Sequence, residues 1–255
     1  MSKNFELMQE EQREMGREPA PISKSSPILF PGPEPVRKSD GVVQEFDRVA
    51  QEECLKLVQR VFLGQASNVT RVIVFAGVDR GAGCSRICVE TSRLLAANTS
   101  GSVCLVDADF RTPSLSGFFA IPDDRGLADA LLSEGSIRTF AKPLTPSNLW
   151  LIPAGDLAPE SPSLLNSDRL KQRLQELRSE FDYVLIDSPA LNLYSDAIAL
   201  GRIADGAVVV LQADSTRRES ALKSLQGLRD ARIDVLGAVL NRRTFPIPDF
   251  VYRRL

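Results

Sequence analysis

Between residues 71 and 241 the sequence alternates short, nearly continuous apolar segments with amphipathic stretches, and this alternation limits the fold more than any other feature. Short β-branched runs that end in glycine or aspartate predict strands that are buried on both faces. The six predicted strands lie at residues 71–77, 102–109, 148–155, 181–188, 206–213 and 234–241. Helices are predicted between them at 83–97, Ser167–Arg178, Asp196–Arg202 and Arg217–Asp230. This order predicts an α/β fold with three layers, in which helices cover both faces of a mostly parallel sheet.

Glycine and polar residues follow the predicted strands at the points where the strands end. They are Gly77–Ser85, Asp107–Asp109, Asp187–Pro189, Asp214 and Asn241. The carboxyl ends of parallel strands lie at one edge of a sheet, and the ligands of such sheets bind beyond that edge. We therefore expect these residues to converge on one site.

The composition divides the chain into three parts. Residues 1–41 are polar and rich in proline, so they cannot bury enough apolar surface to fold alone. We interpret them as a disordered tail that serves as a linker, with docking onto a partner protein as the alternative. Apolar residues recur at helical spacing from residue 42, which places the folded domain at 42–245 and a short C-terminal tail at 246–255.

Histidine is absent from the whole chain, which excludes Ser-His-Asp and Cys-His catalysis. Any proton transfer would have to use Asp, Glu, Lys, Tyr or Cys. The four cysteines match no zinc-binding pattern. Cys88 and Cys104 lie in apolar stretches, and we interpret them as small buried thiols.

Charge and hydropathy indicate a cytoplasmic protein that does not bind nucleic acid. The net charge of −2 gives the whole protein no electrostatic attraction to a polyanion. No apolar run reaches the roughly 18 residues that span a bilayer. The N-terminal residues are acidic and polar, unlike a secretory signal.

The segment AGVDRGAGCSR at 76–86 follows a predicted strand and opens a predicted helix, which is the context of a phosphate-binding loop. Its glycines permit tight turns, and amides at the N-terminus of a helix favour an anion. Ser85 is placed to offer its hydroxyl to Mg²⁺, but Cys84 occupies the position at which ATP-binding loops have lysine. A neutral thiol is too short to reach the β and γ phosphates. A glycine-rich turn without a ligand is the alternative.

Two acidic motifs follow the loop. In VCLVDADFRTPSL at 103–115, Asp107 and Asp109 occupy alternate positions, so their side chains would point the same way if the strand continues. In FDYVLIDSPAL at 181–191, four apolar residues run into Asp187, as in a Walker-B strand that positions Mg²⁺. Such carboxylates can hold Mg²⁺ or orient a nucleophile. The alternatives are a solvated loop for the first motif and a strand-end cap for the second.

In this order the three motifs resemble those of the bacterial tyrosine kinases of capsule and exopolysaccharide synthesis, a branch of the MinD/ParA-like P-loop ATPases. The strongest match is VDADFRTPSL, which is similar to the family's Asp-x-Asp-x-Arg-x-Pro-Ser-Leu motif. The resemblance extends over roughly residues 50–242, nearly the whole folded part. It includes Gly126–Leu131, NLWLIPAG, Ser163–Ser167, FDYVLIDSPAL, Asp196–Ala197, ADGAVVVLQADST and VLGAVLN.

The resemblance implies ATP and Mg²⁺ as cofactors and assigns the residues of the site. The phosphate loop would be Gly81, Ala82, Gly83, Cys84, Ser85 and Arg86. The catalytic carboxylates would be Asp107, Asp109 and Asp187, and Mg²⁺ would be held by Ser85, Asp107 and Asp187. Asn241 would lie near the adenine.

The resemblance also implies partners. A membrane chain-length or polysaccharide co-polymerase protein would recruit the domain to the inner face of the cell membrane. The segment EECLKLVQRVFL at 52–63 looks like a worn form of the family's Glu-x-x-Arg-x-x-Arg oligomerisation helix, so a homo-oligomer through this helix is expected. Glu53 is retained, whereas Lys56 and Gln59 replace the arginines.

Three departures from the family indicate a degenerate member. Cys84 replaces the lysine, Arg86 stands where the family has Ser or Thr, and the tail has only Tyr252 in place of a tyrosine cluster. Losing one preorganised donor to developing negative charge costs about 3 kcal/mol. We therefore predict a tyrosine-kinase-like regulator of polysaccharide synthesis or export whose ATP binding and phosphotransfer are weakened or lost. The alternatives are an active tyrosine autokinase, in which Arg80 or Arg86 replaces the lysine, and a MinD/ParA-type positioning ATPase.

Overall fold

The computed structural model describes residues 51–64, 70–156 and 161–243. The tails predicted at 1–41 and 246–255 lie outside the described residues, as does the part of the first helical pattern before residue 51. In the described ranges, no helix combines the length and the apolar character needed to cross a membrane.

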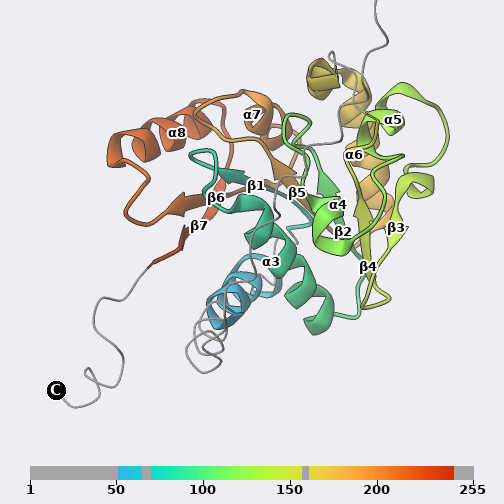
Figure 1. Ribbon diagram of the computed structural model, residues 1–255, viewed down its shortest axis with the longest axis horizontal. Helices are drawn as coiled ribbons and strands as arrows, with labels where there is room; N and C mark the ends of the chain where they lie inside the picture. The colour runs from blue at the N-terminus through green and yellow to red at the C-terminus, as the bar shows by residue number, and fades with distance from the viewer. Residues whose placement is uncertain (1–50, 65–69, 157–160, 244–255) are drawn as a thin grey trace, which may run out of the picture. The chain divides into compact units, whose positions relative to one another are not determined.

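A seven-stranded sheet with the order β3-β4-β2-β5-β1-β6-β7 forms the centre of the described domain (Figure 1). Its strands are β1 Val72–Gly77, β2 Val103–Asp107, β3 Lys142–Pro143, β4 Leu149–Ile152, β5 Tyr183–Ser188, β6 Gly206–Gln212 and β7 Val235–Asn241. Neighbouring strands are parallel except β3 and β4, which are antiparallel. The predicted α/β fold with a mostly parallel sheet is confirmed.

Helices cover both faces of this sheet. They are η1 Gln59–Leu63, α3 Cys84–Asn98, α4 Leu115–Phe119, α5 Leu127–Leu132, η2 Ile137–Phe140, η3 Ser161–Asn166, α6 Asp168–Glu180, α7 Asp196–Gly201 and α8 Arg218–Asp230. An α-helix at 51–58 continues into the π-helix η1. Figure 1 shows α7 and α8 on one side of the sheet and α3 on the other.

Two apolar clusters form the core because alternate residues of a strand face opposite sides. In β1, Val72 and Val74 join the cluster that contains residues of α5, α6, α7 and α8. Ile73 and Phe75 join the cluster that contains residues of α3 and of the helix at 51–63. The central strands are therefore buried on both faces, as their continuous apolar runs predict.

The predicted strands differ from the observed ones mainly at their ends. The strand predicted at 102–109 ends at Asp107, because Asp109 donates its amide to the Asp107 carboxylate and leaves the ladder. The strand predicted at 148–155 ends at Ile152, because the next residue is Pro153, which has no N–H to donate. β3 has only two residues, one of them proline, and carries no apolar run that would predict it.

The register brings the predicted motifs side by side. Asp107 at the end of β2 is the partner of Asp187 on β5, and Ala76 on β1 is the partner of Ser188. The glycine-rich loop leaves β1 next to this point. The loop and both acidic motifs thus share one edge of the sheet.

Candidate functional site

The loop between β1 and α3 has the backbone of a phosphate cradle. Gly81 and Gly83 have φ angles of 83° and 86°, in the left-handed region that favours glycine. Within the described residues, the amides of Gly83, Cys84 and Ser85 have no protein acceptor. They lie at the N-terminus of the 15-residue helix α3, where the helix dipole adds to their attraction for an anion.

Asn241 joins the end of β7 to this loop. Its Nδ2 donates to the main-chain oxygen of Ala82 at 2.8 Å, and its Oδ1 accepts from the amide of Arg242 at 2.8 Å. A Cβ atom on Gly83 would lie 2.3 Å from the Asn241 Nδ2, so the bond leaves room only for glycine there. Asn241 is therefore part of the loop's support. A position near an adenine stays a prediction.

Asp187 supplies a buried carboxylate next to the loop. Its side-chain oxygens have no hydrogen-bond partner in the described part of the chain, although the residue is only 1% exposed. Burial, followed by the charge of Asp107, raises the pKa of Asp187 to about 8, while the nearby Ser85 hydroxyl and Cys84 thiol lower it. Leaving such a group unpaired is costly. A cation that also binds the Ser85 hydroxyl would satisfy it, so these two residues fit Mg²⁺.

Asp107 is as deeply buried as Asp187, but both of its carboxylate oxygens accept hydrogen bonds. Its Oδ2 accepts from the amides of Ser114 and Leu115, both at 3.0 Å, and its Oδ1 accepts from the amide of Asp109 at 3.2 Å. Burial raises its pKa to about 6, and the three amides oppose that shift. Asp107 thus holds the start of α4 through Oδ2, while Oδ1 accepts a single amide.

Asp109 lies in the turn after β2. Its Oδ1 accepts from the amides of Arg111 at 3.1 Å and Thr112 at 3.0 Å, and its Oδ2 accepts from the Thr112 hydroxyl at 2.9 Å. The strand ends at Asp107, so the condition under which Asp107 and Asp109 are expected to point the same way is not met. The reason is that each carboxylate folds the chain into a turn by accepting backbone amides.

The side chain of Cys84 lies close to Asp187 and to the main chain of Gly77. Burial, then the charge of Asp187, raises the pKa of the thiol well above its usual range. The thiol therefore stays protonated and brings no positive charge to the loop. Arg80 and Arg86 are exposed residues of the same segment. Cys88 and Cys104 are fully buried, as predicted.

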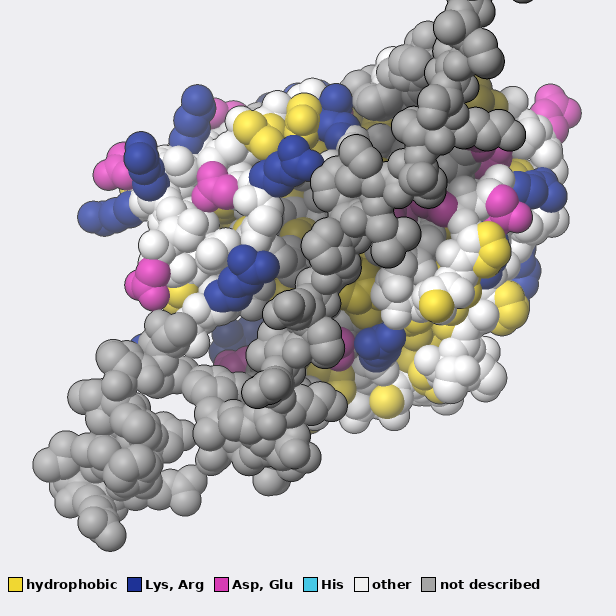
Figure 2. Space-filling view, viewed as in Figure 1, with side chains coloured by type: hydrophobic (Ala, Val, Ile, Leu, Met, Phe, Trp, Pro, Cys, Tyr) yellow, Lys and Arg dark blue, Asp and Glu magenta, His cyan; other side chains and the backbone are white. Residues whose placement is uncertain are grey.

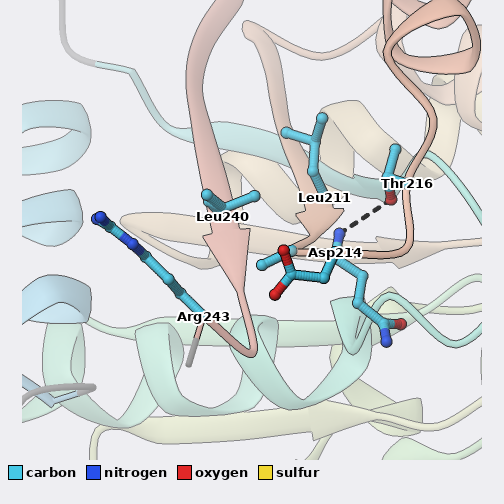
Figure 3. Close-up of a pocket in the computed structure, with 7 residues that line it drawn as sticks. Leu211, Asp214, Thr216, Leu240 and Arg243 are labelled. Atoms are coloured by element: carbon cyan, nitrogen blue, oxygen red, sulfur yellow. Dashed lines mark hydrogen bonds between the residues drawn. The ribbon is translucent and has the colours of Figure 1, made fainter. Parts of the chain in front are cut away.

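A cavity of about 240 Å³ lies at the carboxyl ends of β6 and β7 (Figure 3). It is lined by Leu211, Gln212, Ala213, Asp214, Thr216, Leu240 and Arg243. The Thr216 hydroxyl accepts from the amide of Gln212 at 3.0 Å, which closes the turn that carries Asp214. Leu240 directly precedes Asn241, whose side chain bonds to the phosphate loop.

The described charged side chains form neither a broad basic surface on the face shown in Figure 2 nor a metal cage. On the face shown in Figure 2, the described Lys and Arg side chains are interspersed with Asp and Glu and form no broad basic surface. In the described ranges, no three Cys, Asp or Glu side chains come together as a metal cage. A bound Mg²⁺ would therefore take most of its ligands from phosphates and water, as this ion commonly does.

The segment between β5 and α7 also belongs to the site, although the sequence reasoning missed it. Asn192 Nδ2 donates to Asp79 Oδ1 at 2.7 Å, at the start of the loop. The Tyr194 ring centre lies 3.8 Å from Cζ of Arg111, whose Nε is 3.0 Å from Oδ2 of Asp196. These partners are far apart in sequence. The available signals were the arginine in the DADFR motif and its partner Asp196, which the family resemblance includes.

Known proteins resemble the chain in sequence and in fold. A family model described as "AAA domain" matches residues 70–231, more than half of the chain. Tyrosine-protein kinase YwqD of Bacillus subtilis is 30% identical over 145 residues, which are 57% of this chain and 61% of YwqD. Tyrosine-protein kinase wzc of Salmonella typhimurium is 30% identical over 191 residues, which are 74% of this chain and 26% of that protein. The matches thus span less than two thirds of the length of either relative.

The solved structure of the chimeric protein CapA2B2 has the same fold. It superposes with a TM-score of 0.71 at 22% sequence identity, and the match covers 76% of this chain and 85% of that one.

Proposed function

Because the chain belongs to the AAA-domain family of P-loop proteins, and within it to the bacterial tyrosine kinases, we propose that it regulates exopolysaccharide or capsule synthesis or export. Its ATP binding and phosphotransfer would be weakened or lost. One observation carries this proposal. The position of the loop lysine holds Cys84, an uncharged thiol that lies against the Asp187 carboxylate.

The retained parts of the site would still bind a nucleotide weakly. The amides of Gly83, Cys84 and Ser85 would hold phosphate oxygens, and Ser85 with Asp187 would hold Mg²⁺. When bound, Mg²⁺ neutralises charge on the β and γ phosphates. Asn241 and the cavity at β6 and β7 would hold the adenine.

The missing lysine limits the rate of phosphotransfer and the affinity for ATP at this site. Loss of one preorganised donor lowers a rate by roughly 10²–10³, about 3 kcal/mol. The lysine is a full charge, so its loss costs more than the loss of a neutral donor.

We propose a membrane chain-length or co-polymerase protein as the partner that brings the domain to the inner face of the cell membrane. A homo-oligomer through the helix at 52–63 is part of the same proposal. Cys54 and Val58 of this helix are buried in the core, while Glu53 and Lys56 are exposed and pair with each other at 2.7 Å. Only the exposed side of the helix is therefore available to a second copy.

An active tyrosine autokinase is the second candidate function. The unpaired, buried carboxylate of Asp187 favours it, because a domain that has lost Mg²⁺ gains nothing from keeping this costly group. Arg80 or Arg86 would then replace the lysine, and Asp109 would orient the tyrosine hydroxyl. The predicted acceptor Tyr252 lies outside the described residues.

Gene replacement in the native host separates the two candidates. The chromosomal gene would be deleted or replaced by the Cys84→Ser or Asp187→Asn form, with protein abundance checked by immunoblot. If the protein is a regulator, the deletion strain should make polymer of altered amount or length, and the Cys84→Ser and Asp187→Asn strains should make normal polymer. Loss of polymer with Asp187→Asn at normal abundance would support the kinase instead, and normal polymer in the deletion strain would overturn both.

A further inference from the structure

Residues 191–196, which we name the bridge segment, bond to the start of the phosphate loop. The amide of Leu191 donates to the oxygen of Gly77 at 2.9 Å, and the amide of Asn192 donates to the oxygen of Val78 at 3.1 Å. The Asn192 side chain adds its bond to Asp79 at 2.7 Å. One end of the bridge segment is therefore fixed to the loop.

The other end of the bridge segment holds Arg111. The guanidinium lies over the Tyr194 ring at 3.8 Å, and Nε pairs with Asp196 at 3.0 Å. The Asp196 side chain is only 4% exposed and that of Arg111 is 32% exposed, so water screens this pair little. The main-chain amide of Arg111 donates to Asp109, which makes the arginine part of the acidic turn.

We propose that Arg111 is a positioning residue that fixes the acidic turn of Asp107 and Asp109 relative to the phosphate loop, through the bridge segment. The contacts form one continuous path from Asp109 through Arg111, Tyr194 and Asn192 to the loop. Its consequence for ligand binding rests on the function proposed above. The acidic turn lies beside Asp187 on the Mg²⁺ side of the site. Loss of the Arg111 contacts should therefore weaken the Mg²⁺-dependent part of ATP binding and leave binding by the loop amides unchanged.

Amide hydrogen exchange, measured without any nucleotide, tests whether Arg111 holds the bridge segment in place. In Arg111→Ala, we expect the amides of Leu191 and Asn192 to exchange about fivefold faster or more. The matched control is Arg93→Ala, because Arg93 also stacks on a ring, that of Phe119 at 4.8 Å, and pairs with Glu90 at 3.4 Å. This control should leave the bridge segment unchanged.

Tyrosine variants test the stacked ring. Tyr194→Phe keeps the ring and should behave as wild type, whereas Tyr194→Leu should behave as Arg111→Ala. Faster exchange confined to residues 109–112 in Arg111→Ala would overturn the proposal, because Arg111 would then only stabilise its own turn. Equal behaviour of the two tyrosine variants would also contradict it.

Nucleotide titration tests the consequence. In a Cys84→Lys background, the ratio of ATP affinity with Mg²⁺ to that with EDTA should fall about tenfold in Arg111→Ala, while the affinity in EDTA stays within about twofold. Arg111→Lys keeps the charge and should restore part of the ratio. Equal loss in both buffers would indicate general destabilisation and overturn the positioning role. Absence of ATP binding in every variant would refute the proposed nucleotide site, and the exchange result alone would then decide the role of Arg111.

Discussion

Asn241 Nδ2 donates to the main-chain oxygen of Ala82 at 2.8 Å, and the Asn241 side chain occupies the space into which a side chain on Gly83 would point. It joins the end of β7 to a loop that leaves β1, two strands away in the sheet. The shape of the phosphate loop therefore depends on a residue that is distant in sequence.

Gly83→Ala is expected to lower the free energy of unfolding by about 3 kcal/mol, because it combines a left-handed φ with a clash against Asn241. Gly81→Ala is the matched control. It shares the left-handed φ, but a Cβ there meets nothing within 4 Å, so the loss should be about 1 kcal/mol. Urea unfolding measures both, and equal losses would refute the clash.

The Asp187 carboxyl makes stability depend on pH. Its folded pKa of about 8 lies above the ordinary value of 3.8, so the folded state retains a proton that the unfolded state has lost. The free energy of unfolding contributed by this group therefore falls as pH rises from about 4 to about 8. Asp187→Asn should remove this dependence and stabilise the protein by on the order of 1–3 kcal/mol at pH 8.

Thermal unfolding across this pH range, with divalent cations removed, measures the effect. The difference in unfolding temperature between wild type and Asp187→Asn should shrink as the pH falls toward 4. A gap that does not change with pH would show that burial of the charge is not its cause. Added Mg²⁺ should stabilise the wild type more than the variant.

Arg173 is buried at 1% exposure and binds three carbonyls that surround the end of α5. It donates to the oxygens of Ala130 at 2.8 Å, Ser133 at 2.6 Å and Gly135 at 2.6 Å. Arg173→Met leaves the Ala130 and Gly135 oxygens without this donor, while the Ser133 oxygen keeps a bond from Arg169 at 2.7 Å, so the free energy of unfolding is expected to fall by about 3 kcal/mol. Lys171→Met on the same helix is the control, because the Lys171 side chain is 62% exposed and pairs with the exposed Asp168, so the free energy of unfolding should fall by under about 1 kcal/mol. Similar losses would show that the buried bonds contribute little.

The apolar runs predicted the six longer strands because helices bury most of these strands on both faces, although the edge strand β7 is only partly buried. The two-residue β3 could not be predicted, since its pairing comes from β4 and not from its own residues. The short helices α4 and α5 were missed for a similar reason. Asp107 binds the start of α4, and Asp129 supplies its carboxylate to the amide of Gly126 at the start of α5.

The candidate site was predictable as a set of residues but not as a set of contacts. Asp107 and Asp187 both end a buried strand, and nothing local shows that one accepts three amides and the other none. The difference arises because residues 114–115 fold back onto Asp107 only. The orientation of Cys84 toward Asp187 likewise depends on packing between α3 and β5.

Calorimetric titration of ATP with Mg²⁺ into the wild type and Cys84→Lys tests the central claim most directly. Cys84→Ser, which stays short and neutral, is the control and should bind like the wild type. The account predicts that Cys84→Lys binds ATP about 100-fold more tightly than the wild type, as expected for a restored charge. Micromolar binding by the wild type, with no gain in Cys84→Lys, would contradict it.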